Sequence, residues 1–222
     1  MENRTFTVRR LCRNHIPMAQ KAFTDFDFLH YNPANSENMM DIMLQGQIWA
    51  AFDGDIMAGC TWLLPADSNL FLKSDAGWEI SDLLETDLSV FATAGYVWMA
   101  EGYENSGIYR AFCRLWVMQA AKIGKNMVVH CSPRHINTDM GRLFENGWCL
   151  RGLRGLDRLV PHFIFAKKAE FTNTEPEIPR NIKKCPLSDT KQLSRLCEQG
   201  WLAVRLDKEA NLLFIQGDDC FG

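Results

Sequence analysis

The residues best placed to do chemistry lie between Tyr96 and Ala111, where a short apolar run is followed by a polar turn and a long helical pattern. Gly102 and Gly107 bracket the turn. Backbone N–H groups in the first turn of a helix have no intrahelical partner, and they lie at the positive end of the helix dipole. The segment therefore predicts a site for a phosphate or pyrophosphate group.

Two common nucleotide-binding loops do not fit this segment. Gly102 and Gly107 have the spacing of the P-loop glycines, but Ile108 and Tyr109 stand where a P-loop has lysine and serine or threonine. The sequence also contains no Gly-x-Gly-x-x-Gly motif. The prediction is therefore of an anion site that differs from both loops.

Histidine and cysteine residues form no recognisable site in the sequence. His130 and His135 flank Cys131, but neither has a partner at metal-ligand spacing, so no metal is predicted. No cysteine stands beside a visible histidine–carboxylate pair, which argues against a thiol nucleophile. Eight single cysteines without a Cys-x-x-Cys pair, in a chain whose start has no apolar leader, predict reduced thiols and a cytoplasmic location.

Composition narrows the classes of function. The chain has 222 residues, of which 47% are hydrophobic, so it can bury a sizeable core. No apolar run reaches the ~20 residues that a membrane span needs, and no membrane partner is predicted. The formal net charge of -3 gives no general attraction to polyphosphate, which argues against a nucleic-acid partner.

The elements that would position the anion site alternate between strands and helices. We expect strands at Phe6–Leu11, Gln47–Phe52, Ile56–Leu64, Tyr96–Glu101, Met127–Cys131, Trp148–Arg154 and Leu159–Lys167. We expect helices at Pro17–Phe23, from Ser36 or Asn38 to Gly46, at Trp78–Leu88, from Gly107 to Gly124, and at Asn137–Asn146. This order predicts an α/β (α+β) fold, with a mixed central sheet and helices on both of its faces.

The chain continues beyond this domain. We expect a main domain at residues 1–170, a linker at 171–180 and a C-terminal extension at 181–222. The extension should hold a helix and a β-hairpin, at Ser188–Gln199, Trp201–Leu206 and Leu212–Gln216. One helix and one hairpin cannot bury their apolar side chains alone. We therefore predict that the extension docks on the main domain, with docking in a homodimer as the alternative.

Two of these segments carry a resemblance to a known family. Glu101–Phe112 is similar to the pyrophosphate loop of the GNAT superfamily of acyl-CoA-dependent N-acyltransferases, and Asn137–Trp148 resembles a later helix of that family. The hairpin turn at Asp53–Asp55 also suits it. The residues of the loop that agree with the family pattern are Tyr103, Gly107, Ile108, Arg110 and Ala111. The resemblance covers roughly residues 5–168 and implies a GNAT-like mixed sheet.

The resemblance also implies an activity. Acetyl-CoA or another acyl-CoA would be the co-substrate, no metal would be needed, and the acceptor would be a small-molecule or peptide amine. A backbone amide near Met99 or Ala100 would polarise the thioester carbonyl, and Glu101 would take the proton from the amine. Asn137 would contact the pantetheine arm, or else cap its own helix. The pyrophosphate would be held by the backbone of Glu104, Asn105, Ser106, Gly107, Ile108 and Tyr109.

Three departures from the family pattern keep other functions open. Glu104 replaces a glutamine or arginine, and Tyr109 replaces a small residue. Phe144 stands where many relatives have a tyrosine that protonates the leaving thiolate. One alternative is therefore a catalytically impaired CoA- or acyl-binding protein. Another is an aminoacyl-tRNA-dependent transferase, against which the acidic charge balance counts.

Overall fold

The computed structural model describes residues 5–19, 47–72, 80, 82–83, 87–94, 97–104, 106–131, 136–154, 162–168 and 181–216. The chain divides into two compact units. Unit 1 consists of Met1–Trp78 and Asp87–Trp116, and unit 2 of Glu79–Thr86 and Val117–Gly222. The division falls inside helix α5 (Ile108–Lys122), so this helix contributes to both units.

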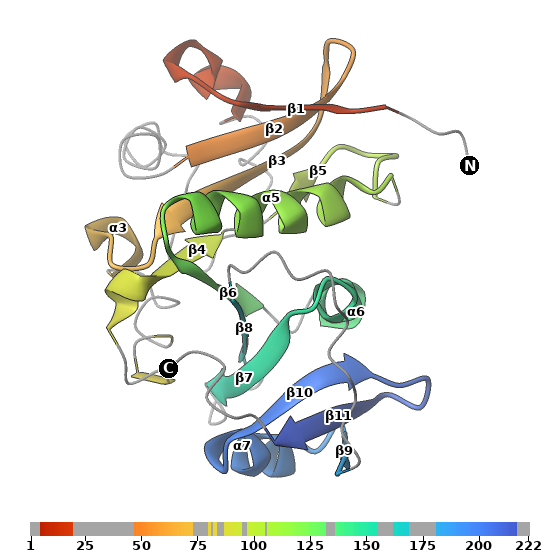
Figure 1. Ribbon diagram of the computed structural model, residues 1–222. Helices are drawn as coiled ribbons and strands as arrows, with labels where there is room; N and C mark the ends of the chain where they lie inside the picture. The colour runs from red at the N-terminus through yellow and green to blue at the C-terminus, as the bar shows by residue number, and fades with distance from the viewer. Residues whose placement is uncertain are drawn as a thin grey trace. The chain divides into compact units, whose positions relative to one another are not determined.

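Unit 1 is built on antiparallel strands (Figure 1). The strands are β1 (Thr7–Arg10), β2 (Gln47–Asp53), β3 (Ile56–Pro65), β4 (Phe91–Ala94) and β5 (Trp98–Met99). β1 pairs with β2, β2 with β3, and both β4 and β5 pair with β3. The predicted first strand and the predicted hairpin around Gly54 are confirmed. The hairpin turn needs a positive φ, and Gly54 adopts a φ of 58°.

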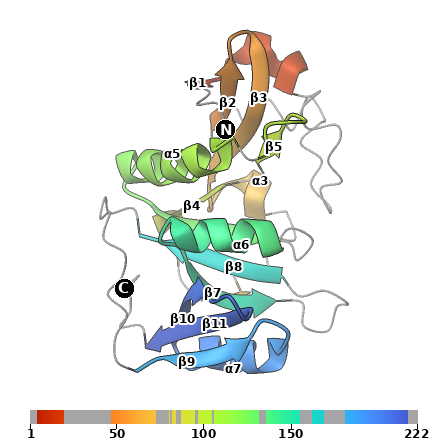
Figure 2. The same cartoon turned by 90° about the vertical axis from the view of Figure 1, so that its right-hand side faces the viewer.

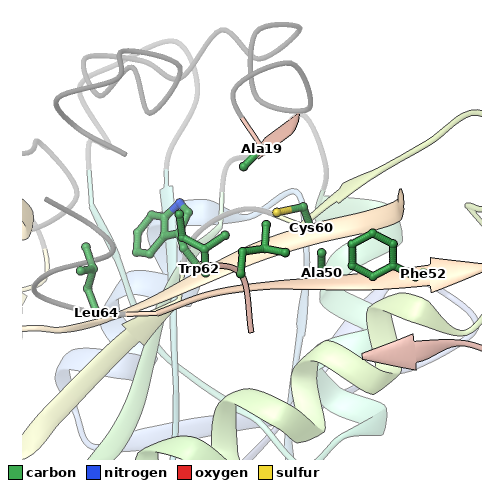
Figure 3. Packing of buried hydrophobic residues seen from close by; sticks show 8 residues of the cluster. Ala19, Ala50, Phe52, Cys60, Trp62 and Leu64 are labelled. Carbon is green, nitrogen blue, oxygen red and sulfur yellow. The ribbon is translucent and has the colours of Figure 1, made fainter. Parts of the chain in front are cut away.

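The residues of β3 alternate between two buried faces, as strand geometry requires. On one face lies α5, whose Trp116 donates its indole N–H to Thr61 Oγ1 at 3.2 Å. On the other face Cys60, Trp62 and Leu64 join a hydrophobic cluster that includes Ala19. Figure 3 shows these three side chains on the face of the strand that is turned away from α5. A strand covered on both sides explains the almost continuous apolar run from Ala58 to Leu64.

Helix α5 has the ends that its sequence predicts. Its buried stripe contains Ile108, Phe112 and Leu115, at the spacing of one helix face. Its last residue is Lys122, and the chain turns out of the helix at Gly124, whose φ is 68°. The N–H groups of Gly124 and Lys125 then donate to carbonyl oxygens in the last turn of the helix, at 3.0 and 2.9 Å.

Unit 2 is also layered, with a sheet whose order is β6-β8-β7-β10-β11-β9 (Figure 2). All five neighbouring pairs in this order are antiparallel. The elements are β6 (Asn126–Cys131), α6 (Ile136–Glu145), β7 (Cys149–Arg154), β8 (His162–Lys167), β9 (Lys183–Pro186), α7 (Thr190–Glu198), β10 (Trp201–Leu206) and β11 (Asn211–Gln216).

The C-terminal extension completes this sheet within its own chain. β10 pairs with β7 at Ala203 and Leu150, and α7 packs against β7 and β10. Leu193 and Leu196 of α7 are consequently buried. Intrachain docking of the extension, which the apolar stripe of its helix predicts, is confirmed. The edge strand β9 was not predicted.

Several predicted elements fall wholly or partly outside the described residues. They are the helix at Pro17–Phe23 beyond residue 19, the helix ending at Gly46, most of the helix at Trp78–Leu88, and the linker at 171–180. A 3-10 turn, η1 (Arg13–His15), precedes the first of them. Also not predicted were the short elements α3 (Asn69–Leu72), η2 (Leu88–Val90) and β4.

Candidate functional site

The strand expected at Tyr96–Glu101 is shorter than predicted, and it is offset from the strand before it. Ala94 of β4 lies opposite Leu63, whereas Trp98 of β5 lies opposite Cys60. Ala94 and Trp98 are four residues apart, whereas their partners on β3 are three residues apart. One extra residue in a strand is the mark of a β-bulge, which redirects the backbone groups beside it. The displaced segment leads directly into the predicted anion site.

The amides of Ala100 and Met99 point in different directions. Ala100 donates its N–H to the carbonyl oxygen of Ala58 at 3.0 Å, so this amide is committed to β3. In an antiparallel ladder the neighbouring residue directs its N–H to the opposite side. Within unit 1, β5 pairs with β3 alone among the described strands, and Met99 therefore presents its N–H at the other edge of β5. Of the two predicted carbonyl-polarising amides, only that of Met99 remains a candidate.

The loop between β5 and α5 consists of two successive turns. Tyr103 donates its N–H to Ala100 O at 3.1 Å, and Ser106 donates its N–H to Tyr103 O at 3.0 Å. The hydroxyl of Ser106 donates to the same oxygen at 2.5 Å. Both donors of Ser106 are thus used inside the loop, so the predicted contact of Ser106 with an anion has no support in this conformation. Gly102, with φ of 83°, allows the first turn.

A long-range contact anchors this loop to the β2–β3 hairpin. The Tyr103 hydroxyl donates to Asp53 Oδ2 at 3.0 Å, and the Tyr103 ring meets Phe6 edge-on with centroids 6.1 Å apart. The sequence suggests only a hairpin turn for Asp53, because nothing in its spacing connects it with a residue fifty positions later. Asp53 is therefore a site residue that the sequence analysis missed.

The start of α5 leaves two backbone N–H groups without a hydrogen-bond partner. The N–H groups of Gly107 and Ile108 have no hydrogen-bond partner among the described residues. Gly107 has φ of 88°, and a Cβ built there meets nothing within 4 Å, so the space in front of it is open. These donors lie at the positive end of a 15-residue helix. The arrangement fits an anionic group, as the sequence predicts for Gly107 and Ile108.

A close approach of helix and strand fixes where this helix end lies. A Cβ at Gly59 of β3 would be 2.8 Å from Ile108 Cγ2 and 3.3 Å from Phe112 Cε2. It would also lie 3.1 Å from the carbonyl oxygen of Trp98. Only glycine at position 59 lets the first turn of α5 rest on β3 beside β5. The anion donors and the Met99 amide are thereby positioned by the same contact.

Two carboxylates of the loop are exposed. Glu101 lies in the first turn after β5 and is the predicted proton acceptor. Glu104 turns back on its own loop, where its Oε1 accepts the Gly102 N–H at 3.3 Å. Its charge is therefore near the loop amides but open to solvent.

Of the three residues that depart from the family pattern, the two aromatic ones are packed in apolar surroundings. Tyr109 is buried, and its ring meets Trp116 edge-on with centroids 6.3 Å apart, so the ring faces the core. Phe144 is buried on α6 and meets Phe165 of β8 in the same way at 5.4 Å. Asn105 and the side chain of Asn137, two further predicted contacts, lie outside the described residues.

No group of three or more histidine, cysteine or acidic side chains that could hold a metal ion occurs in the described part of the chain. None of the described helices is both long and apolar enough to cross a membrane.

Comparison with known proteins identifies the fold. No protein-family model matches the sequence, and no curated protein is similar enough in sequence to count as a relative. Solved structures do match. NAA60 of Arabidopsis thaliana in complex with acetyl-CoA superimposes with a TM-score of 0.55 at 18% identity, covering 74% of this chain and 98% of that one.

Three bacterial structures agree with it. The putative acetyltransferase yncA of Salmonella typhimurium, solved with acetyl-CoA, has a TM-score of 0.55 at 10% identity and covers 77% of this chain and 97% of its own. The ribosomal-protein-S18-alanine N-acetyltransferase of Escherichia coli has a TM-score of 0.54 at 12% identity, with 78% and 99% covered. A putative acetyltransferase of the GNAT family from Desulfovibrio desulfuricans matches at 0.53. The predicted fold class is confirmed: the chain has the fold of the GNAT acetyltransferases.

Proposed function

We propose that this chain is a divergent member of the GNAT superfamily and an acyl-CoA-dependent N-acyltransferase. The observation that carries the proposal is the pair of amides at the start of α5, Gly107 and Ile108, that have no hydrogen-bond partner among the described residues. Gly107 is exposed, and a Cβ built there meets nothing within 4 Å. These two amides would hold the pyrophosphate of acetyl-CoA or another acyl-CoA. The offset strand β5 lies next to them and presents the Met99 amide at its edge.

Two residues of this site would each have one role in the reaction. The Met99 N–H would donate to the thioester oxygen, on which negative charge develops as an amine attacks the carbonyl carbon. Glu101, directly or through a water, would accept the proton that the amine loses. The acyl group would pass to the amine in one step, without a covalent bond to the protein. The CoA thiol would be the leaving group.

The acceptor is proposed to be a small-molecule or peptide amine. Among the matching structures, one is a chimera of the spermidine N-acetyltransferase SpeG, and another is the S18-alanine enzyme. The first is named for a polyamine acceptor, and the second for an alanine of a ribosomal protein. The GNAT-like domain of residues 1–170, the linker at 171–180, the extension at 181–222 and a cytoplasmic location stay predictions of the sequence.

A second candidate function follows from Phe144. In the resemblance it replaces the tyrosine that protonates the leaving thiolate, and in the structure it is buried against Phe165. A phenyl ring has no proton to give. The alternative is therefore a protein that binds CoA or an acyl group without transferring it.

Release of the CoA thiol from acetyl-CoA in the presence of a panel of amines tests these candidates. The proposal predicts thiol release with at least one amine, and a fall of about 10²-fold or more for Glu101→Gln. The matched control is Glu209→Gln, an exposed carboxylate in the β10–β11 turn, which should leave the rate unchanged. Binding of acetyl-CoA without thiol release for any amine favours the second candidate. Failure to bind acetyl-CoA contradicts both.

A further inference from the structure

Cys12 and His15 form a contact that the proposed acyl-transfer site does not use. Cys12 Sγ lies 3.0 Å from His15 Nδ1 and 2.7 Å from Asn14 Oδ1. The pair lies in the red helical segment after β1 in Figure 1. Its position is fixed, because the preceding residue, Leu11, donates its N–H to Ile48 O of β2 at 2.8 Å. The Cys-x-x-His spacing of these two residues is visible in the sequence, but no site was predicted there.

The hydrogen bonds identify which histidine nitrogen faces the thiol. Besides the sulfur, Nδ1 receives the backbone N–H of Cys12 at 3.1 Å. Because Nδ1 accepts from this N–H, it is the unprotonated nitrogen of the neutral ring, and Nε2 carries the proton. A basic imidazole nitrogen within hydrogen-bond distance of a thiol is the arrangement that activates a cysteine nucleophile. A half-turn of the Asn14 amide would present its NH2 group to the resulting thiolate.

Exposure separates Cys12 from the other described cysteines. Cys12 is exposed, whereas Cys60, Cys113, Cys131 and Cys185 are buried and Cys149 and Cys197 are partly buried. Burial raises the pKa of the Cys197 thiol to about 12, and it also raises the pKa of Cys185. These two thiols stay protonated at neutral pH and react poorly with electrophiles. Among the described cysteines, Cys12 is therefore the most accessible to a reagent that attacks thiols.

The surroundings of Cys12 favour reagents with negative charge. Arg9, Arg10 and Arg13 lie within three residues of Cys12, and all three are exposed. The described residues from 5 to 19 contain no aspartate or glutamate. Local positive charge of this kind raises the concentration of anions near it.

We propose that Cys12 is a site of reversible thiolation by low-molecular-mass disulfides that carry negative charge. The thiol, which donates to Asn14 Oδ1 in the structure, turns to His15 Nδ1 as that nitrogen releases the Cys12 N–H. His15 Nδ1 then takes the thiol proton, and the Cys12 sulfur attacks one sulfur of the disulfide. A bond forms between these two sulfurs while the original S–S bond breaks. The released thiolate takes the proton back from His15 and leaves as a thiol. The inference is independent of the acyl-transfer proposal.

Oxidised glutathione is the probe, and peptide mapping by mass spectrometry locates the product. The proposal predicts a mixed disulfide at Cys12, formed faster than the mixed disulfide from the cationic disulfide cystamine. His15→Asn keeps an acceptor for the Cys12 N–H but has no basic nitrogen, so it should slow the reaction by about tenfold or more. Arg13→Gln should slow the reaction with oxidised glutathione and not that with cystamine.

Each other result overturns the proposal. The dyad is refuted if His15→Asn reacts at the wild-type rate, or if modification maps to another cysteine. Equal rates for the two disulfides refute the preference for anions. If His15→Asn does not fold, the wild-type chain is compared in buffer and in denaturing urea. The folded chain must then react faster at Cys12 than the unfolded one.

Discussion

Tyr103 connects the loop before α5 to the β2–β3 hairpin and to Phe6. Its hydroxyl donates to Asp53 at 3.0 Å, and its ring contacts Phe6. Tyr103→Phe removes only the hydroxyl and should lower the free energy of unfolding by about 1 kcal/mol. The loop loses its tie to the hairpin, so acetyl-CoA should also bind more weakly in calorimetry.

A double-mutant cycle controls this prediction. Asp53→Ala combined with Tyr103→Phe should cost less than the sum of the two single changes, since both remove the same hydrogen bond. Asp55→Ala, in the same turn and exposed, should change neither stability nor binding. Strictly additive effects would show that the contact does not hold the loop.

Glu104 places a negative charge on the loop that is proposed to receive a pyrophosphate. Its carboxylate accepts the Gly102 N–H and is exposed. Glu104→Gln keeps an acceptor for this N–H and removes the charge. Because solvent screens the repulsion, we expect acetyl-CoA affinity to rise by only about 1 kcal/mol at low salt, and by less as salt is added. An affinity that does not change at low salt would show that the carboxylate does not act on the ligand.

For single residues, the sequence predicts which backbone N–H groups lie near the site better than it predicts which of them are free to bind a ligand. Gly107 was identified because a glycine between a strand and a helix is a local signal. Ala100 and Ser106 were named through the resemblance to the GNAT family, but their N–H groups donate to the carbonyl oxygens of Ala58 and Tyr103. Which amide is left for a ligand depends on strand register and turn geometry, and these are set by residues far away in the sequence.

Among the elements, the contact of α5 with β3 does most to position the site. Gly59→Ala would place a methyl group 2.8 Å from Ile108 and 3.1 Å from the Trp98 carbonyl oxygen. We expect it to lower the free energy of unfolding by about 1–3 kcal/mol and to displace the start of α5. Chemical denaturation gives the stability, and calorimetry gives the affinity for acetyl-CoA.

The matched control is Gly141→Ala, in the interior of α6. A Cβ there meets nothing within 4 Å, so the substitution should raise stability by about 0.5–1 kcal/mol through helix propensity. Equal effects of the two substitutions would mean that α5 does not rest on β3 as described.

Helices and isolated hairpins were predicted well because their signals are periodic and local. α5, α6 and α7 begin and end close to the expected residues, and the β2–β3 and β10–β11 hairpins are in place. β4 was missed, since its run Phe-Ala-Thr-Ala has only four residues and weak alternation. The offset between β4 and β5 is not visible without the partner strand β3.

For the whole molecule, the C-terminal extension is part of the sheet of unit 2. β10 adds to β7, and the buried Leu193 and Leu196 of α7 cover that sheet. Deleting residues 172–222 should expose these apolar surfaces and an unpaired strand edge. The truncated chain should melt at a lower temperature or aggregate, at every protein concentration tested. A truncated chain that stays monomeric and equally stable would contradict this role.

The sequence predicted that the extension docks but not the strand on which it docks. Its apolar content requires a partner surface, and that argument is independent of topology. The pairing of Ala203 with Leu150 could not be predicted, because sheet order depends on contacts between segments distant in the chain. The match covers 97–99% of these solved structures but only 74–78% of this chain. About a quarter of this chain therefore has no counterpart in them.

The central claim is that the start of α5 binds the pyrophosphate of an acyl-CoA, and calorimetry with acetyl-CoA on two variants tests it most directly. Gly107 and Gly124 lie at opposite ends of α5, with φ of 88° and 68° and open space around each. Gly107→Glu and Gly124→Glu therefore carry similar backbone strain and the same added charge. The account predicts that only Gly107→Glu abolishes binding of acetyl-CoA. Wild-type affinity in Gly107→Glu, or equal losses in both variants, would contradict it.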